Sequence, residues 1–111
     1  MTSPFEEIAN LDKLIHEPSR LAILTALSAC ESADFLSVRR LTGLSDGNLS
    51  VHLSKLEEAG LVNIQKGFVA KKPRTQLRIT KKGITAIQRH WDQLAAIRQS
   101  ADAWDHDSPE G

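Results

Sequence analysis

The hydrophobic positions in the N-terminal part of the chain predict two helices. Residues 1–16 carry apolar side chains at helical spacing, and Ser3 followed by Pro4 is typical of a helix start. A second helix is predicted from Pro18, because a proline at the first helical position loses no hydrogen bond. The apolar residues that mark the core-facing side of this second helix are Leu21, Leu24 and Leu27.

Two more helices, joined by a short turn, are predicted in the middle of the chain. Ser37 is expected to cap a short helix that ends near residue 42, where Gly43 supplies a left-handed residue. A longer helix is expected over 46–59, with Ser45 or Asp46 as its cap. Its apolar residues recur at i, i+4 and i+7 and therefore face the core: Leu49, Leu53 and Leu56.

The hydrophobic period changes after residue 60. Residues 61–69 and the alternating residues 76–80 predict two strands around a polar, basic loop over 71–74. This is the pattern of a β-hairpin, although no Asn-Gly turn fixes its register. Thr80 is then expected to cap a last long helix.

These elements predict a mainly α-helical fold with a small β-hairpin, in the order of a winged helix-turn-helix. The length of 111 residues suffices for one hydrophobic core, so we expect a single domain over 1–111. Within it we expect an N-terminal helix over 1–16, a winged core over 17–80, a C-terminal dimerisation helix over 81–104 and a flexible tail over 105–111.

Charge is segregated along the chain, although 14 basic and 14 acidic residues give a net charge of zero. Residues 1–33 hold two bases and five acids, residues 34–90 eleven bases and four acids, and residues 91–111 one base and five acids. The net charges of the three segments are therefore −3, +7 and −4. Because affinity for a phosphate backbone depends on local charge, the basic centre favours a nucleic-acid partner.

Three stretches resemble the winged-helix transcriptional regulators of the MarR- and ArsR-like type. PSRLAIL (18–24) is similar to their opening helix, and LSDGNLSVHLSKLEEAGLV (44–62) to their recognition helix and the turn into the wing. LRITKKG (77–83) is similar to the link between the wing and the dimerisation helix. The resemblance implies a homodimer that binds double-stranded DNA sequence-specifically and represses by occluding a promoter. Relief of repression by an unidentified small-molecule effector is a further hypothesis.

With its leucines inward, the helix over 46–59 presents small and polar residues outward. Asn48 can hydrogen-bond an adenine edge and Val51 can touch a thymine methyl group. The alternatives are a local bond of Asn48 to Ser45 or Asp46, and an exposed Val51 without a role. The candidate DNA-binding residues of this helix are Gly47, Asn48, Ser50, Val51, Ser54 and Lys55.

Basic side chains of the wing and its flanks form a second group of candidates. Lys71, Lys72 and Arg74 are expected at the adjacent minor groove or its flanking phosphates. Further phosphate contacts are expected from one or two residues of a second set, with solvation or pairing with Glu57 or Glu58 as the alternative. This second set comprises Arg39, Arg40 and Arg78.

The two terminal helices carry apolar stripes that exceed what the winged core can bury. A second copy is predicted to cover them, since the 3-4-3 spacing in the last helix is typical of a coiled-coil seam. The alternative is that this helix folds back on its own domain. The predicted dimer-interface residues are Phe5, Ile8, Ile15, Ile84, Ile87, Trp91, Leu94 and Ile97.

Motifs for catalysis and metal binding are missing from the sequence. It has no glycine-rich phosphate loop, no His-Glu-x-x-His and no nucleophile elbow, so we expect no enzyme and no cofactor. Four dispersed histidines and the single Cys30 predict no metal site, although sensing by these residues stays open. The absence of a long apolar run and of a leader predicts a cytoplasmic protein. The alternative function is a winged-helix protein-interaction module.

Overall fold

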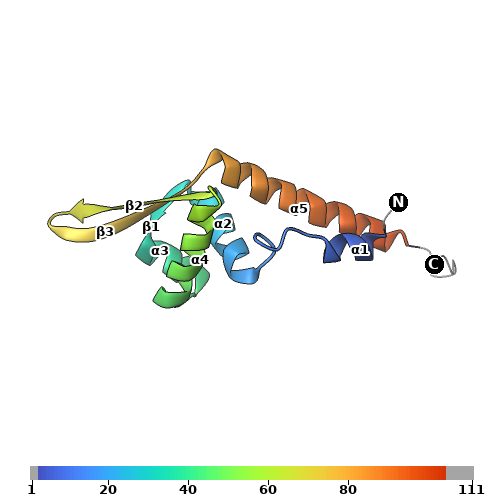
Figure 1. Ribbon diagram of the computed structural model, residues 1–111, viewed down its shortest axis with the longest axis horizontal. Coiled ribbons are helices and arrows are strands. Elements are labelled where there is room, and N and C mark those ends of the chain that lie inside the picture. The colour runs from blue at the N-terminus through green and yellow to red at the C-terminus, as the bar shows by residue number, and fades with distance from the viewer. Residues whose placement is uncertain (1–2, 105–111) are drawn as a thin grey trace.

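The computed structural model describes residues 3–104 and confirms the predicted fold class (Figure 1). Helices dominate, and a small antiparallel sheet completes a winged-helix arrangement. The tail expected over 105–111 lies outside the described residues. In chain order the elements are α1 (Pro4–Ala9), α2 (Pro18–Cys30), β1 (Ser32–Asp34), α3 (Phe35–Thr42), α4 (Asp46–Glu58), β2 (Val62–Val69), β3 (Lys72–Ile79) and α5 (Lys81–Asp102).

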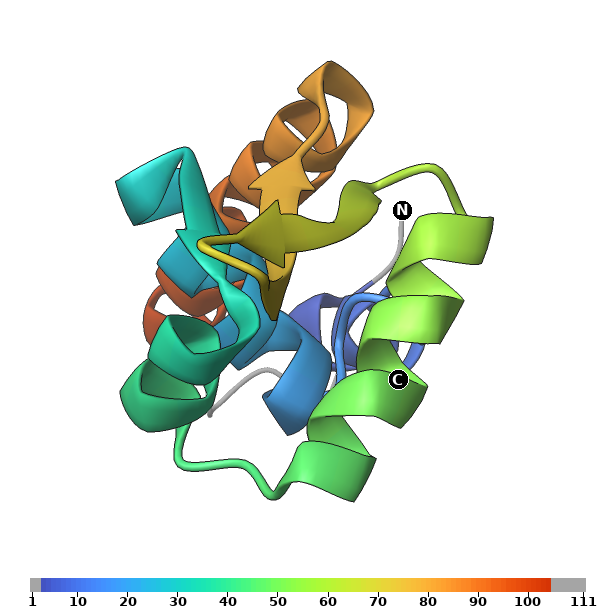
Figure 2. The same cartoon turned by 90° about the vertical axis from the view of Figure 1, so that its left-hand side faces the viewer.

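The molecule is elongated, with extents of 66 × 25 × 21 Å. Helices α2, α3 and α4 pack with the base of the sheet into one head, from which the β2–β3 hairpin projects as the wing (Figure 1). Helix α5 runs away from the head in the opposite direction, and α1 lies along its far end (Figure 1). Viewed from the wing end, α3 and α4 flank the hairpin (Figure 2). The wing and the α1–α5 arm therefore occupy opposite ends of the molecule.

The sheet has the strand order β1-β3-β2, and both pairings are antiparallel. Strand β1 was not predicted, because three residues are too few to show an alternating pattern. The register of the hairpin pairs Val69 with Lys72, so its loop is only Ala70 and Lys71. Both have positive φ angles, 51° and 66°, as in a type I′ turn. The tight turn makes most of the predicted basic loop part of β3.

Side-chain caps explain where most of the helices begin. The predicted caps Ser3, Ser45 and Thr80 are confirmed, since each accepts a backbone N–H from the first turn of its helix. The predicted cap Ser37 is wrong, because α3 begins two residues earlier, at Phe35. Its cap is the carboxylate of Asp34, which accepts the backbone N–H of Ser37 at 2.8 Å. A charged acceptor makes the stronger cap.

The first helix is shorter than predicted and ends at Ala9 instead of near residue 16. The Oδ1 of Asp12 accepts a hydrogen bond from the backbone N–H of Leu14 at 2.9 Å. This bond stabilises a turn at residues 12–14 and competes with the helix. Pro18 further disfavours helical geometry at the residue before it. Residues 10–17 therefore form a bent linker that still buries Leu11 and Ile15.

The core lies between α2, α4 and the base of the sheet. As predicted, Leu49, Leu53 and Leu56 of α4 are buried in it. The apolar residues of the cluster are Ile15, Ile23, Leu24, Leu27, Val38, Leu49, Leu53, Leu56, Leu61, Val62, Leu77, Ile79 and Ile87.

Three of the predicted dimer-interface residues are buried inside their own chain, which corrects that prediction. Ile15 and Ile87 belong to the core cluster, and Ile97 is only 4% exposed. The cause is that α5 has two apolar faces, and the inner one packs on α2 and α1. The other five lie further out: Phe5, Ile8, Ile84 and Trp91 are exposed, and Leu94 is half-buried.

Candidate nucleic-acid interface

Helix α4 exposes all six residues predicted to contact DNA. The exposed residues of its N-terminal half all have short side chains: Asp46, Gly47, Asn48, Ser50 and Val51. The backbone N–H of Asn48 donates to the Ser45 hydroxyl at 3.2 Å, while the Asn48 side chain is exposed. The local hydrogen bond considered for Asn48 therefore uses its backbone N–H and leaves its side-chain amide group free to face a ligand.

The hairpin register sorts the wing residues into two faces. Residues alternate along each strand, and Ile64 and Leu77 face the core beside α4. Lys66, Phe68 and Pro73 share this face, while the other face carries Lys72, Arg74 and Arg78. Arg78 thus lies on the far side of the sheet base from α4, so its predicted contact with the same duplex stays a prediction. Lys71 lies in the turn at the tip.

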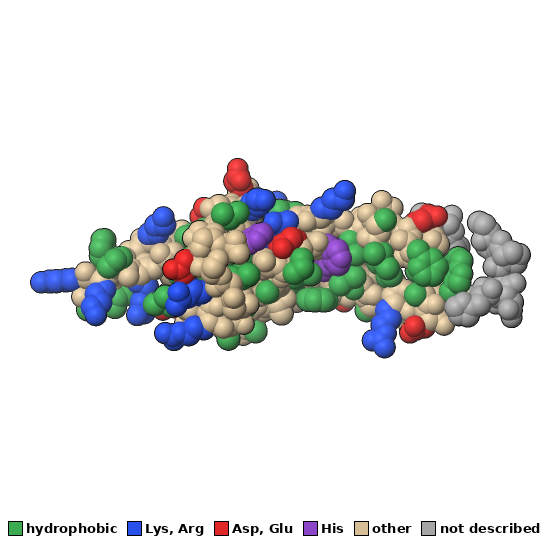
Figure 3. Space-filling model, turned by 90° about the horizontal axis from the view of Figure 1, so that it is seen from below, with side chains coloured by type: hydrophobic (Ala, Val, Ile, Leu, Met, Phe, Trp, Pro, Cys, Tyr) green, Lys and Arg blue, Asp and Glu red, His purple; other side chains and the backbone are tan. Residues whose placement is uncertain are grey.

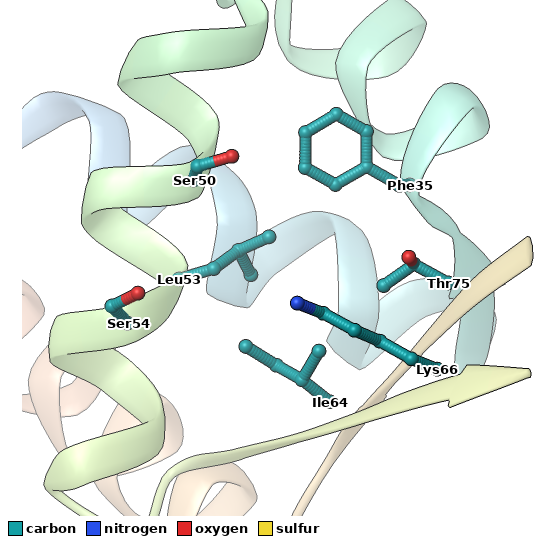
Figure 4. Close-up of a pocket in the computed structure, with 7 residues that line it drawn as sticks. All are labelled: Phe35, Ser50, Leu53, Ser54, Ile64, Lys66 and Thr75. Atoms are coloured by element: carbon teal, nitrogen blue, oxygen red, sulfur yellow. The ribbon is translucent and has the colours of Figure 1, made fainter.

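A groove of about 310 Å³ separates α4 from the wing (Figure 4). The hydroxyls of Ser50 and Ser54 line one wall, and Lys66 of β2 extends from the hairpin toward α4 (Figure 4). Two hydroxyls and an ammonium group are the donors that hold phosphate oxygens in protein–DNA complexes. Lys66 was absent from the predicted site. The signal for Lys66 in the sequence is that every second residue of a strand faces the same side, which puts Lys66 on the same face as Ile64 and Phe68.

The electrostatic surroundings of this groove are strongly positive. The hairpin that forms one wall of the groove, residues 62–79, contains five lysines and arginines and no aspartate or glutamate. Blue side chains gather around the wing end of the molecule (Figure 3). Such a concentration of one charge suits a polyanion.

The arginines near the groove differ in how they are held. Arg39 forms a 3.0 Å ion pair with Asp46, which ties α3 to the first turn of α4. Arg74 lies 3.9 Å from Asp34. Hydrogen bonds from Ser37, together with the nearby charges of Arg74 and Arg40, hold the pKa of Asp34 below its ordinary value.

For Arg39, the structure replaces the alternative partners Glu57 and Glu58 by Asp46. Arg40 is exposed on α3. The phosphate contact expected of Arg40 stays a prediction.

Behind the reading face, His52 anchors α4 to the start of α2. Its Nδ1 lies 3.1 Å from Nη1 of Arg20 and 3.6 Å from Oε2 of Glu17. Burial acts to raise the pKa of Glu17, but hydrogen bonds from Arg20 and Ser19 and the neighbouring positive charges lower it overall. His52 therefore positions the helix from behind.

Two histidines that are far apart in the sequence meet near the middle of α5. Nδ1 of His16 lies 3.1 Å from Nε2 of His90, and His90 is 2% exposed. Burial and the neighbouring His16 lower the pKa of His90, while Asp12 acts in the opposite direction. Nδ1 of His90 is buried without a hydrogen-bond partner. Within residues 3–104, no three His, Cys, Asp or Glu side chains gather in a way that could hold a metal ion.

Two further features bear on the sequence predictions. Cys30 is a free, exposed thiol at the end of α2. No helix of the described part of the chain has the length and apolar character needed to span a membrane.

Known proteins match this chain over most of its length. A family model described as a winged helix DNA-binding domain matches residues 19–97. The uncharacterized protein MJ0432 of Methanocaldococcus jannaschii is 35% identical over 88 residues, which cover 79% of this chain and 96% of that protein. The HTH-type transcriptional regulator YgaV of Escherichia coli is 36% identical over 61 residues, or 55% of this chain and 62% of YgaV.

A solved structure is also similar over nearly its whole length. The transcriptional regulator homologue from Pyrococcus horikoshii OT3 superposes with a TM-score of 0.80 at 31% identity, covering 87% of this chain and 98% of that one. The groove between α4 and the wing thus lies in a fold shared with DNA-binding regulators. The chain belongs to the winged-helix DNA-binding domain family of transcriptional regulators.

Proposed function

We propose that the protein is a homodimer that binds double-stranded DNA sequence-specifically and represses transcription by occluding a promoter. The observation that carries this proposal is the division of the elongated molecule into two ends. One end carries the exposed face of α4 and the basic wing, and the other carries exposed apolar side chains on α1 and α5.

The shape and chemistry of the first end suit a duplex. An α-helix fits a major groove about 12 Å wide, and the short side chains of α4 let its N-terminal half approach the base edges. In this arrangement Asn48 and Val51 face the bases, and Ser50, Ser54 and Lys66 hold the phosphates. The wing then reaches the neighbouring groove with Lys71 and Lys72.

The second end suits a second copy of the chain. Phe5, Ile8 and Trp91 remain exposed after α1 has packed on α5, and Ile84 is exposed nearer the head, in the first turn of α5. Phe5 also contacts Trp104 edge to face with ring centroids 5.4 Å apart. Large side chains gathered on a long helix are costly to leave in water, and a two-fold related copy covers them on both chains at once. A dimer also presents two copies of α4, one for each half-site of a two-fold symmetric DNA sequence.

Repression is the simplest outcome of this arrangement, since a dimer bound across a promoter excludes the polymerase. Its relief by a small-molecule effector stays a prediction. The rival proposal, a protein-docking module, requires the basic end to bind an acidic protein and not a duplex.

The dimer is tested with the substitution Trp91→Glu, which adds a charge to the exposed apolar surface. Trp91 is 46% exposed and contacts His90 edge to face, so thermal unfolding of the variant has to show that its fold is kept. Gln93→Glu is the matched control, because it adds the same charge to the same helix about 200° away from Trp91.

We expect the native chain and the control to sediment at twice the 12.2 kDa chain mass, and Trp91→Glu to sediment as a monomer with weaker DNA binding. A native chain that stays monomeric at micromolar concentration refutes the dimer. Binding to an acidic protein but to no duplex at low salt favours the docking module.

A further inference from the structure

The tip of the wing carries a large apolar side chain that the reading of bases by α4 does not use. Phe68 is 77% exposed, the highest value among the large exposed hydrophobic residues of the described chain. Its aromatic ring has no core to fill at this position, since the wing projects away from the head (Figure 1). Phe68 and the exposed Pro73 opposite it form a contiguous apolar patch, and such a patch marks a surface that contacts a partner.

The hairpin geometry holds this ring rigidly and on the side of α4. Phe68 pairs with Pro73 across the ladder, on the same face as Lys66. With a two-residue loop, Val69 and Lys72 close the turn, so Phe68 and Pro73 occupy the next, non-hydrogen-bonded pair, where side chains lie closest. Proline at such a position removes no hydrogen bond of the hairpin. The tip is therefore a stiff apolar edge formed by Phe68 and Pro73.

Cations surround this apolar edge. Lys66 precedes it on the same face, Lys71 lies in the adjacent turn and Lys72 follows the turn. No acidic residue occurs between residues 59 and 91. The tip thus has an apolar centre surrounded by positive charge. The apolar centre suits insertion between the bases of a duplex, and the lysines suit the phosphates on either side.

We propose that Phe68, backed by Pro73, is a wedge that enters the minor groove beside the site of α4 and partly unstacks one base step. This inference rests on the proposed DNA-binding function and adds to it a deformation of the duplex. Apolar wedges of this kind, Phe and Pro among them, kink DNA by about 20–90° toward the major groove. The wedge favours flexible pyrimidine–purine steps, so it contributes specificity at bases that α4 never reaches.

A second copy bound along the α1–α5 arm does not explain the tip, because this arm extends from the head in the direction away from the wing (Figure 1). An acidic protein would satisfy the lysines. Binding to an acidic protein would not, however, account for the apolar edge of Phe68 and Pro73 on the side of the wing that faces α4.

The wedge is tested by measuring the shape of the bound duplex. Forty-base-pair duplexes recovered by selection from a random pool carry a dye at each end, so that energy transfer reports the bend. A second set carries 2-aminopurine at successive positions, so that its fluorescence reports unstacking. The variants are Phe68→Ala and Phe68→Leu. Val69→Ala is the matched control, because Val69 is 51% exposed on the same strand but on the opposite face.

We expect the native protein to bend the duplex and to raise 2-aminopurine fluorescence at one step per wing. Phe68→Ala removes both signals and lowers affinity about tenfold, with an unchanged salt dependence because no charge is lost. Phe68→Leu keeps part of each signal, and Val69→Ala behaves as the native chain.

Two results overturn the inference in distinguishable ways. If Phe68→Ala binds within about twofold of the native affinity and still bends and unstacks the duplex, the wedge is refuted while the DNA-binding function stands. If the selection at low salt recovers no duplex that the native protein binds, both the wedge and the proposed function fail.

Discussion

Replacing Lys71, Lys72 and Arg74 by alanine is the sharpest probe of the electrostatics of the wing. All three side chains are exposed, and none contributes to the hydrophobic core. Arg74 makes only a partly solvated contact with Asp34 at 3.9 Å, and such exposed pairs add little to stability. The triple variant is therefore expected to fold as the native chain does and to differ in its phosphate contacts.

The structure sets the size of the expected effect. Arg39 is engaged by Asp46, and Arg78 lies at the base of the sheet, where β3 pairs with both β1 and β2, away from the tip of the wing. The exposed cations that remain on α3, α4 and the outer part of the wing are Lys55, Lys66, Lys71, Lys72, Arg74 and Arg40.

Six phosphate contacts give a slope of log K against log salt of about −5 per subunit, so affinity falls about a thousandfold between 50 and 200 mM salt. Removing three contacts reduces the slope to about −2.7 and the loss to about fortyfold over the same interval.

The assay is fluorescence anisotropy of a labelled duplex titrated at several salt concentrations. A control variant with Lys13, Arg89 and Arg98 replaced by alanine removes the same charge at residues away from α4 and the wing. We expect its slope to match the native one. If both triple variants change the slope equally, overall charge and not the wing governs binding, and the assignment of the wing is refuted.

Two further predictions concern the support of the reading head. A Cβ at Gly83 would lie 2.2 Å from the backbone oxygen of Leu61, so Gly83→Ala should lower the free energy of unfolding in urea by about 2 kcal/mol, whereas Gly67→Ala, with no atom within 4 Å, should not. Because the folded state depresses the pKa of His90, the unfolded state binds more protons below about pH 6.5, and stability should fall as the pH drops through this range. His90→Phe should remove this part of the pH dependence of unfolding; an unchanged pH profile would contradict the account of the His16–His90 contact.

The reading helix was predictable because its signals are local. Leu49, Leu53 and Leu56 repeat within one helix, and the Ser45 cap acts on the turn beside it. The outward residues of α4 follow directly from the inward ones by the geometry of the helix. The same locality explains why Thr80 correctly marked the start of α5.

Features that depend on distant parts of the chain were not predictable. His16 and His90 are 74 residues apart, and no pattern in the sequence relates them. Lys66 belongs to the groove because the hairpin folds against α4, and the Ala70–Lys71 turn sets which face it occupies. The helical spacing of its apolar residues showed that α5 buries part of its surface. It could not show that Ile87 and Ile97 face their own chain while Trp91 does not.

The central claim, that a dimer reads DNA with α4 and the wing of each subunit, is tested most directly by selecting bound fragments from genomic DNA. The account predicts that the recovered fragments share an inverted repeat whose half-sites are centred about 10 base pairs, or one helical turn, apart. Recovery of fragments with no shared sequence, or with a single unrepeated site, would contradict it.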